Sequence, residues 1–404
     1  MEQPNMNVDI AIVGAGPAGL CLARALGGTG LEVAVIDPAD DPALATPVPD
    51  GREIALTHAS RASLDRLSLW SRIDPGDISD LRDAWVFDGE SSDPMQITHE
   101  DGQAEQLGWL VANHLIRKAA WEAAHEVDGI HWLTGQRVES TLPGEDYRQL
   151  ILSDGTTIRS RLVVAADGRF SGTRRAAGIG ARMRDFGKSM LVARMELDRS
   201  HDHVAWEWFG EDRTLALLPL NGPCASVVIT LPHEQIEQLK SMNEPDFNQQ
   251  ATGLYRERLG QMRLVSERYV YPLVGVWPDR LTAQRFVCIG DAAVGMHPVT
   301  AHGFNLGLIG VDLLVDEIGK ARIRDGEIAS PRRLASYAAR HRAHSLPLYS
   351  ATATVVGLFT DDRLPARLLR RVILRTANRI PPFRRAIARQ LTGAGGLIER
   401  LVQR

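Results

Sequence analysis

The feature that most constrains this chain is a glycine-rich turn between a short strand and a helix near the N-terminus. Residues 8–13 (VDIAIV) form an apolar, β-rich run, residues 14–19 (GAGPAG) supply the turn, and residues 20–26 (LCLARAL) have a helical pattern. A second apolar run, residues 31–37, ends in Asp37. In such a unit the helix N-terminus faces a pyrophosphate and the acid accepts a ribose hydroxyl. The pattern predicts dinucleotide binding rather than a purely structural turn.

The three glycines of this turn have separate steric reasons. Gly14 permits the sharp bend, Gly16 lets the backbone approach the pyrophosphate, and Gly19 lets the helix pack closely on the strand. The turn alone does not distinguish FAD from a nicotinamide dinucleotide.

Two later glycine–acid motifs narrow this choice. Residues 161–175 (RLVVAADGRFSGTRR) contain an apolar run that ends in Asp167-Gly168. Residues 285–298 (RFVCIGDAAVGMHP) contain another, which ends in Gly290-Asp291 and leads towards a helical pattern from Gly303. A single turn of this kind is unremarkable, because Asp and Gly are common turn residues. Three in this order are expected to meet at one edge of an open α/β sheet, where ligands bind.

The length and composition fit a globular protein with two closely joined domains. The chain has 404 residues, of which 44% are hydrophobic and 24% charged. It has no apolar run near the roughly 18–20 residues that a membrane-spanning helix needs, and its N-terminus lacks the basic region of a signal peptide. We therefore expect a cytoplasmic protein.

The three cysteines, Cys21, Cys224 and Cys288, lie far apart in apolar surroundings without a CxxC spacing. We expect buried, reduced thiols, and no metal site is predicted.

The middle of the chain, from about residue 176 to residue 280, alternates strand-like runs such as SMLVARMEL, TLALLPL and CASVVITL. These runs predict a mostly antiparallel sheet. Trp206, Trp208 and Phe209 occur there, and aromatic residues in strands are more often core than ligand contacts. No substrate-contacting residue is assigned in this part of the chain.

The ordered motifs resemble those of the FAD-dependent aromatic hydroxylases with the p-hydroxybenzoate hydroxylase fold, and within them the ubiquinone-biosynthesis hydroxylases. The resemblance covers nearly the whole chain. Its segments are GAGPAG, DGREIALTHAS from Asp50, GWLVANHLIRKAA from Gly108, AADGRFSGTRR from Ala165, WEWFGEDRTLALLPL from Trp206, GDAAVGMHPVTAHGFNLGLIG from Gly290, and IPPFRRAIARQLTGAGG from Ile380.

The resemblance implies an α/β fold in three parts. Residues 1–175 and 281–345 would form a discontinuous, Rossmann-like FAD-binding domain. Residues 176–280 would form an inserted, mostly antiparallel substrate-binding β domain, and residues 346–404 a basic, helical C-terminal region.

The resemblance also implies cofactor contacts at matching positions. The turn would hold the FAD pyrophosphate and Asp37 the adenosine ribose. Asp167 would serve both FAD and the nicotinamide cofactor. The implied cofactor-binding residues are Gly14, Gly16, Pro17, Ala18, Gly19 and Asp37; Arg52 over the phosphates; Asn113 and Val138 near the ribityl chain and the adenine; Asp167; Gly290 and Asp291 at the ribityl and phosphate region; and Pro298, Gly303, Phe304 and Asn305 beside the isoalloxazine.

Two positions depart from the family pattern. Val294 stands where the family usually has the histidine of GDAAH, and Ala301-His302-Gly303 stands where it usually has GQG. His302 is either a polar spacer or a catalytic group, because an imidazole can donate a hydrogen bond or accept a phenolic proton near neutral pH.

The implied activity is an FAD-dependent monooxygenase that hydroxylates the ring of a polyprenylated phenol in ubiquinone biosynthesis. Such enzymes use NAD(P)H and O2 through a C4a-hydroperoxyflavin, and the flavin rather than a side chain does the difficult step. Alternatives are a flavin hydroxylase of another aromatic metabolite and a non-catalytic, FAD-bound member of a quinone-biosynthesis complex. A halogenase is disfavoured because the chain reads WEWFGE and has no lysine before Lys118. A saturase of isoprenoid chains differs in adding no oxygen to its product.

The C-terminal region is strongly basic. From Arg363 onward it has eleven arginines and one acid, Glu399, and several arginines recur at every fourth residue beside a leucine-rich face. The leucines either pack on the body with the arginines in solvent, or the region contacts the inner face of the membrane or an acidic quinone-biosynthesis complex. No nucleic-acid partner is expected, because no recognised nucleic-acid-binding fold accompanies the arginines.

Overall fold

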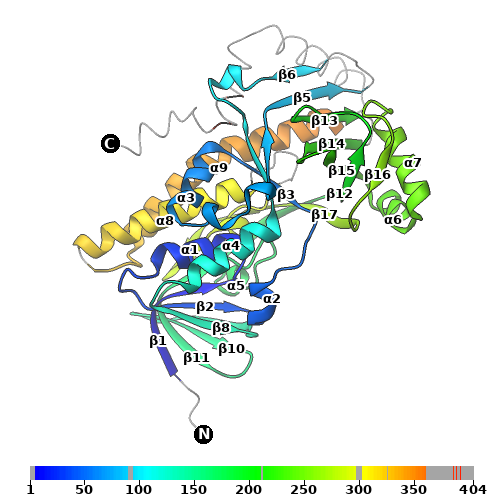
Figure 1. Ribbon diagram of the computed structural model, residues 1–404. Coiled ribbons are helices and arrows are strands. Elements are labelled where there is room, and N and C mark those ends of the chain that lie inside the picture. Colours follow the sequence, from blue (N-terminus) through cyan, green and yellow to red (C-terminus); the bar gives the residue numbers. More distant parts are fainter. Residues whose placement is uncertain are drawn as a thin grey trace.

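The computed structural model describes residues 5–89, 94–210, 213–296, 303–324 and 326–360, together with Arg385, Ala388 and Thr392. The strands of this part form three sheets, and two long helices, α8 and α9, run alongside them (Figure 1). The first sheet lies near the N-terminus, and the second lies at the opposite end of the view.

The first sheet has a parallel core with antiparallel margins. Its order is β18-β19-β11-β1-β2-β8; β10 pairs with β11 and with β9 in antiparallel fashion. The helix α1 (Pro17–Leu26) connects the parallel neighbours β1 and β2, as predicted. The strands are β1 (Asn5–Val13), β2 (Val33–Asp37), β8 (Ile130–Thr134), β9 (Val138–Pro143), β10 (Arg148–Leu152), β11 (Thr157–Ala165), β18 (Thr282–Ala283) and β19 (Phe286–Cys288).

The second sheet is antiparallel apart from the parallel pair β13 and β5, which agrees with the predicted mostly antiparallel sheet. Its order is β16-β12-β15-β14-β13-β5-β6, and β17 pairs with β12. Because β5 and β6 belong to it, this sheet also uses residues before 175. The strands are β5 (Asp83–Asp88), β6 (Met95–Ile97), β12 (Ala181–Leu197), β13 (Val204–Gly210), β14 (Arg213–Pro219), β15 (Cys224–Pro232), β16 (Met262–Leu264) and β17 (Tyr269–Pro278).

One face of the second sheet packs on two helices, α6 (His233–Ser241) and α7 (Glu244–Leu254). Trp208 lies in the apolar cluster of this face, and Trp206 packs against that cluster, as expected for core aromatics. Phe209 is also buried.

A small third sheet, β3 (Glu53–Leu56), β7 (Gly108–Ala112) and β4 (Ile78–Leu81), completes the strands. The helix α8 (Gly303–Arg324) packs on α1, on α3 (His58–Arg66) and on α9 (Pro331–Thr360). The other α-helices in the described ranges up to residue 360 are α2 (Asp41–Ala45), α4 (Asn113–His125) and α5 (Gly172–Ala176). No helix within the described ranges is long and apolar enough to cross a membrane.

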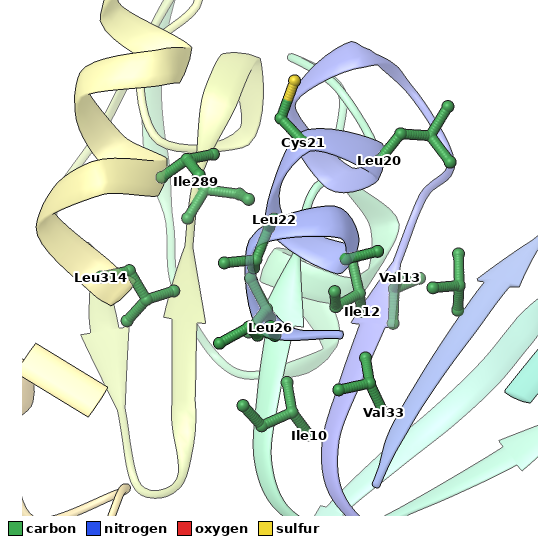
Figure 2. Close-up of a cluster of buried hydrophobic side chains, with 14 of the residues drawn as sticks. Ile10, Ile12, Val13, Leu20, Cys21, Leu22, Leu26, Val33, Ile289 and Leu314 are labelled. Atoms are coloured by element: carbon green, nitrogen blue, oxygen red, sulfur yellow. The ribbon is translucent and has the colours of Figure 1, made fainter. Parts of the chain in front are cut away.

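The main core lies between the first sheet and its helices. Figure 2 shows Ile10 and Ile12 of β1 beside Leu22 and Leu26 of α1, with Leu314 of α8 nearby. Two of the three cysteines are buried here: Cys21 and Cys288 have no exposed surface, and burial raises the pKa of both thiols. Cys224 is partly buried, and all three are free thiols.

Candidate active site

The register of the first sheet brings four strand ends to one edge. Val13 pairs with Ile36 on one side and with Ala165 on the other, and Ala165 pairs with Cys288. The residues that follow these strands therefore lie side by side. This arrangement confirms that the three glycine–acid motifs, separated by up to about 270 residues, share one edge of the sheet.

The glycine turn is tightly packed on its protein side. Gly14 has φ +110°, and a Cβ built there would lie 2.5 Å from the carbonyl oxygen of Ala166. A Cβ on Gly19 would overlap the carbonyl oxygen of Gly14. Neither position can accept a side chain without a shift of the backbone.

Gly16 shows the opposite environment. A Cβ built there has no protein atom within 4 Å, and Gly16 is the N-cap residue of α1 with no side-chain cap. The first N–H groups of a helix need a partner, and the helix dipole favours an anion at this end. The open, uncapped turn therefore has the space and the donors that a pyrophosphate requires.

Asp37, at the end of β2, holds this turn in place. Its two carboxylate oxygens accept hydrogen bonds from the Ala15 N–H at 2.6 Å and from the Ala39 N–H at 2.8 Å. Each oxygen can still accept another hydrogen bond, because a carboxylate has about four acceptor positions. Val138, predicted near the adenine, begins β9, two residues after Gln136, whose N–H donates to the Asp37 carbonyl oxygen at 3.0 Å.

A second group forms around Arg52. Arg52 Nη2 lies 2.6 Å from Asp50 Oδ2, and Asn113 Nδ2 donates to the same oxygen at 2.7 Å. The Tyr271 hydroxyl donates to the Asp50 carbonyl oxygen at 2.6 Å. Burial alone would raise the pKa of Asp50, but the hydrogen bonds and charge of Arg52, with the Asn113 hydrogen bond, lower it. The structure thus brings the predicted Arg52 and Asn113 together through Asp50 and ties them to the second sheet.

Asp167 lies at the sheet edge but is engaged with the next helix. It accepts hydrogen bonds from the Ser171 hydroxyl and from the Thr173 N–H, the latter at 3.0 Å. The acid therefore shapes the start of α5. Its side chain remains partly exposed at the edge.

Asp291 is paired with a residue that the sequence did not single out. Arg169 Nη2 lies 2.9 Å from Asp291 Oδ2, and both side chains are about one-third exposed, at 27% and 33%. Arg174 is 2% exposed and donates to the carbonyl oxygens of Arg169 and Ala292, at 3.3 Å each. Arg169 directly follows Asp167-Gly168, and this position in the motif could have marked it as a residue of the site.

The second half of the site packs against the first. A Cβ on Gly290 would lie 3.0 Å from the Ala18 Cβ, and Gly307 of α8 lies against the same two residues. Asn305 is 4% exposed; its amide donates to the Ala55 carbonyl oxygen at 2.8 Å and accepts from the Thr57 N–H at 3.4 Å. The start of α8 is thereby fixed beside β3.

The structure describes some, but not all, of the residues singled out around the start of α8. Gly303 is the first residue of α8, and Phe304 packs partly buried on the main core. Pro298 and His302 lie outside the described residues. Val294 is 2% exposed in an apolar cluster with Met296, so valine suits this position.

Comparisons with known proteins agree with this geometry. A family model described as an FAD binding domain matches residues 7–349. Ubiquinone hydroxylase UbiM of Neisseria meningitidis is 42% identical over 393 residues, covering 96% of this chain and 85% of that protein. Ubiquinone hydroxylase UbiL of Rhodospirillum rubrum is 33% identical over 386 residues, covering 95% and 89%.

A solved structure shows the same fold. The p-nitrophenol 4-monooxygenase PnpA of Pseudomonas putida DLL-E4 superposes with a TM-score of 0.78 at 19% identity, covering 97% of this chain and 99% of that one. The chain therefore belongs to the FAD-binding-domain family of FAD-dependent monooxygenases and, within it, to the ubiquinone hydroxylases.

Proposed function

We propose that this protein hydroxylates the aromatic ring of a polyprenylated phenol in ubiquinone biosynthesis, with NAD(P)H as the reductant and O2 as the oxidant. The observation that carries the proposal is the similarity to a ubiquinone hydroxylase along 96% of the chain. The open glycine turn at the edge of the first sheet also supports it, because ring hydroxylation by this family depends on bound flavin.

We further propose that the predicted cofactor residues hold FAD. The N–H groups at the start of α1 and the positive charge of Arg52 would neutralise the pyrophosphate, and Asp37 would accept a ribose hydroxyl. Asp291 and Asn305 would help to place the ribityl and ring portions. When bound, FAD would supply the hydride-accepting and oxygen-activating chemistry. The protein orients the two reactants and excludes water between the sheets.

His302, which directly precedes the first residue of α8, is the proposed catalytic group. A histidine there would hydrogen-bond to substrate or cofactor and accept a phenolic proton. In His302→Gln we expect lower turnover with unchanged FAD content. Unchanged turnover would assign His302 to a spacer role.

We also propose that the protein is cytoplasmic and docks at the inner face of the membrane, where a polyprenylated substrate resides, through its basic C-terminal region. Arg385 is exposed, whereas Ala388 is fully buried against Met95, Ile97 and Leu107. Ala388 thus packs on the body while Arg385 faces outward. Flotation with vesicles rich in anionic lipid tests this proposal: loss of residues 363–404 should reduce binding, and equal binding would contradict it.

The test of the proposed function is quinone profiling by mass spectrometry in a strain that lacks this gene. A prenylated phenol that lacks a ring oxygen should accumulate and should disappear when the gene is restored. A normal quinone pool would contradict the ubiquinone assignment. If the purified protein oxidises NAD(P)H at a rate that no phenol increases, the proposed hydroxylase activity is contradicted.

A further inference from the structure

The second sheet has two different faces. One face packs on α6 and α7, as described above. Residues on the other face reach the cofactor-binding side: Arg194 Nη2 lies 2.6 Å from Glu53 Oε1, next to Arg52, and the Tyr271 hydroxyl bonds to Asp50. This second face therefore forms a wall of the space beside the proposed cofactor.

The strand register places Glu207 on this wall. Val192 of β12 pairs with Val228 of β15, Val228 pairs with Ala216 of β14, and Ala216 pairs with Glu207 of β13. Directly paired residues lie on the same face of a sheet. Arg194 and Val192, two residues apart on one strand, share that face as well. Glu207 thus faces the same side as Arg194, whereas its neighbours Trp206 and Trp208 face the helices.

The Glu207 carboxyl has no hydrogen-bond or ion-pair partner in the part of the chain that the structure describes. Its side chain is only partly buried, yet loss of solvation raises its pKa well above that of an ordinary glutamate. The backbone of α9 packs against β13. The carboxyl is therefore partly exposed on a strand that α9 contacts, which fits its poor hydration.

Ser226 is a second unpaired polar group on the same wall. It pairs with Arg194 and with Leu218, so it shares their face. Its side chain has no exposed surface, and its hydroxyl lacks a partner among the described residues. Buried polar groups are nearly always hydrogen-bonded, because an unpaired one costs about 1–3 kcal/mol. Ser226 has no surface open to a ligand, so the partly exposed Glu207 carboxyl, and not Ser226, is the group on this wall that a ligand can contact.

The remaining neighbours in the Glu207 row are apolar. Val86 of β5 pairs with Glu207 on one side, and Ala216 and Val228 follow on the other. An apolar surface with one carboxyl suits a ligand that is mostly hydrocarbon and carries a single hydroxyl. It does not suit a carboxylate-bearing substrate, which would repel Glu207 when that group is ionised.

We infer that Glu207 is a substrate-binding residue whose carboxyl hydrogen-bonds to a ring hydroxyl of the prenylated phenol. This inference rests on the proposed function. A site built around a hydroxyl discriminates against ligands without one, because its polar group would then stay unpaired. Glu207 therefore selects a free phenol over its methyl ether.

The test measures this selection directly. The purified, FAD-loaded protein is titrated with 2-geranylphenol and with its methyl ether, and binding is followed by the perturbation of flavin absorbance. Wild type should bind the phenol at least about tenfold more tightly, the effect of one hydrogen bond of about 1.4 kcal/mol. Glu207→Gln should keep most of this preference, since an amide still donates and accepts. Glu207→Leu should bind both compounds equally.

Glu196→Gln is the matched control, because Glu196 lies on the same sheet but is 37% exposed and paired with Arg263. It should behave as wild type. If Glu207→Leu loses FAD, Glu207→Ala gives the same comparison with a smaller side chain. Replacing an unpaired, poorly hydrated carboxyl with an apolar group should also leave the unfolding temperature unchanged or raised.

Two adverse outcomes are distinguishable. If wild type binds and hydroxylates the phenol but Glu207→Leu keeps the wild-type preference, the assignment of Glu207 is wrong and the proposed function stands. If wild type neither binds nor hydroxylates the phenol, the proposed function fails and this inference fails with it.

Discussion

At the scale of single residues, the cofactor turn combines glycines that the fold requires with one that a ligand requires. Gly14 and Gly19 have no room for a Cβ, whereas Gly16 faces open space at the N-terminus of α1. Packing against protein atoms explains Gly14 and Gly19. The proposed approach of the FAD pyrophosphate to the backbone explains Gly16.

This contrast predicts different results for two alanine substitutions. Gly16 has an ordinary extended conformation with φ −73°, which alanine can also adopt. Gly16→Ala should therefore leave the stability of the apoprotein within about 0.5 kcal/mol of wild type. Its methyl group should weaken FAD binding by about tenfold or more, or about 1.4 kcal/mol. Fluorescence titration of the apoprotein with FAD measures the affinity, and denaturant unfolding measures the stability.

Gly14→Ala is the companion variant. Its positive φ and the close Ala166 carbonyl should destabilise the apoprotein itself by about 1–3 kcal/mol.

The result that would contradict the first prediction is a Gly16→Ala protein that binds FAD as tightly as wild type. It would show that no phosphate approaches this turn.

Asp50 predicts a pH dependence of stability. Its pKa in the folded protein is lowered, so its contribution is complete above the ordinary value of about 3.9 and is lost as the pH falls through that value towards the folded pKa. Asp50→Asn should be less stable than wild type at pH 7, and its unfolding temperature should fall less between about pH 5 and pH 3. Thermal unfolding across this range is the measurement.

Asp65→Asn serves as the control for this experiment, because Asp65 is 51% exposed in a long 3.7 Å ion pair with Arg61. It should follow the wild-type profile. If the unfolding temperature of Asp50→Asn falls with pH in parallel with that of wild type, Asp50 does not contribute to the acid sensitivity.

At the scale of elements, α8 carries the link between the two halves of the site. Asn305 fixes its first turn to β3 through the Ala55 carbonyl and the Thr57 N–H. Asn305→Ala should leave both backbone groups unpaired, lower stability by about 1–3 kcal/mol and also weaken FAD binding, because the start of α8 loses its position.

Asn243→Ala separates the two effects. Asn243 is the N-cap of α7, far along the chain from the site, and its loss should cost about 1 kcal/mol. FAD affinity should then be unchanged. If both alanine variants affect FAD affinity equally, the link through Asn305 has no special role.

Local patterns predicted the elements that hold the cofactor, but not their long-range partners. Strand, glycine turn, helix and acid are encoded within about thirty residues, so β1, α1 and β2 could be read directly. The Arg169–Asp291 ion pair and the Tyr271–Asp50 hydrogen bond join residues 122 and 221 positions apart. No local pattern around Glu207 predicts which side of the sheet its carboxyl faces, because that depends on pairing with β14 and β5. The same limit applies to β5 and β6, which join the second sheet through a parallel pair with β13.

At the scale of the whole molecule, the two large sheets have separate tasks. The first sheet offers strand ends and a helix N-terminus, which suit a dinucleotide. The second offers the apolar row around the unpaired Glu207 carboxyl, where we propose that the prenylated phenol binds. The third sheet and α8 join them, with Asp50, Arg52 and Asn305 at the contacts.

The central claim is that this architecture transfers one oxygen atom from O2 to the ring of a prenylated phenol. The most direct test incubates the FAD-loaded protein with NADPH or NADH, 2-geranylphenol and isotopically labelled 18O2, and analyses the product by mass spectrometry. A hydroxylated phenol that carries a single 18O atom is predicted. Oxidation of the nicotinamide with no labelled product, or a product whose new oxygen comes from water, would contradict the claim.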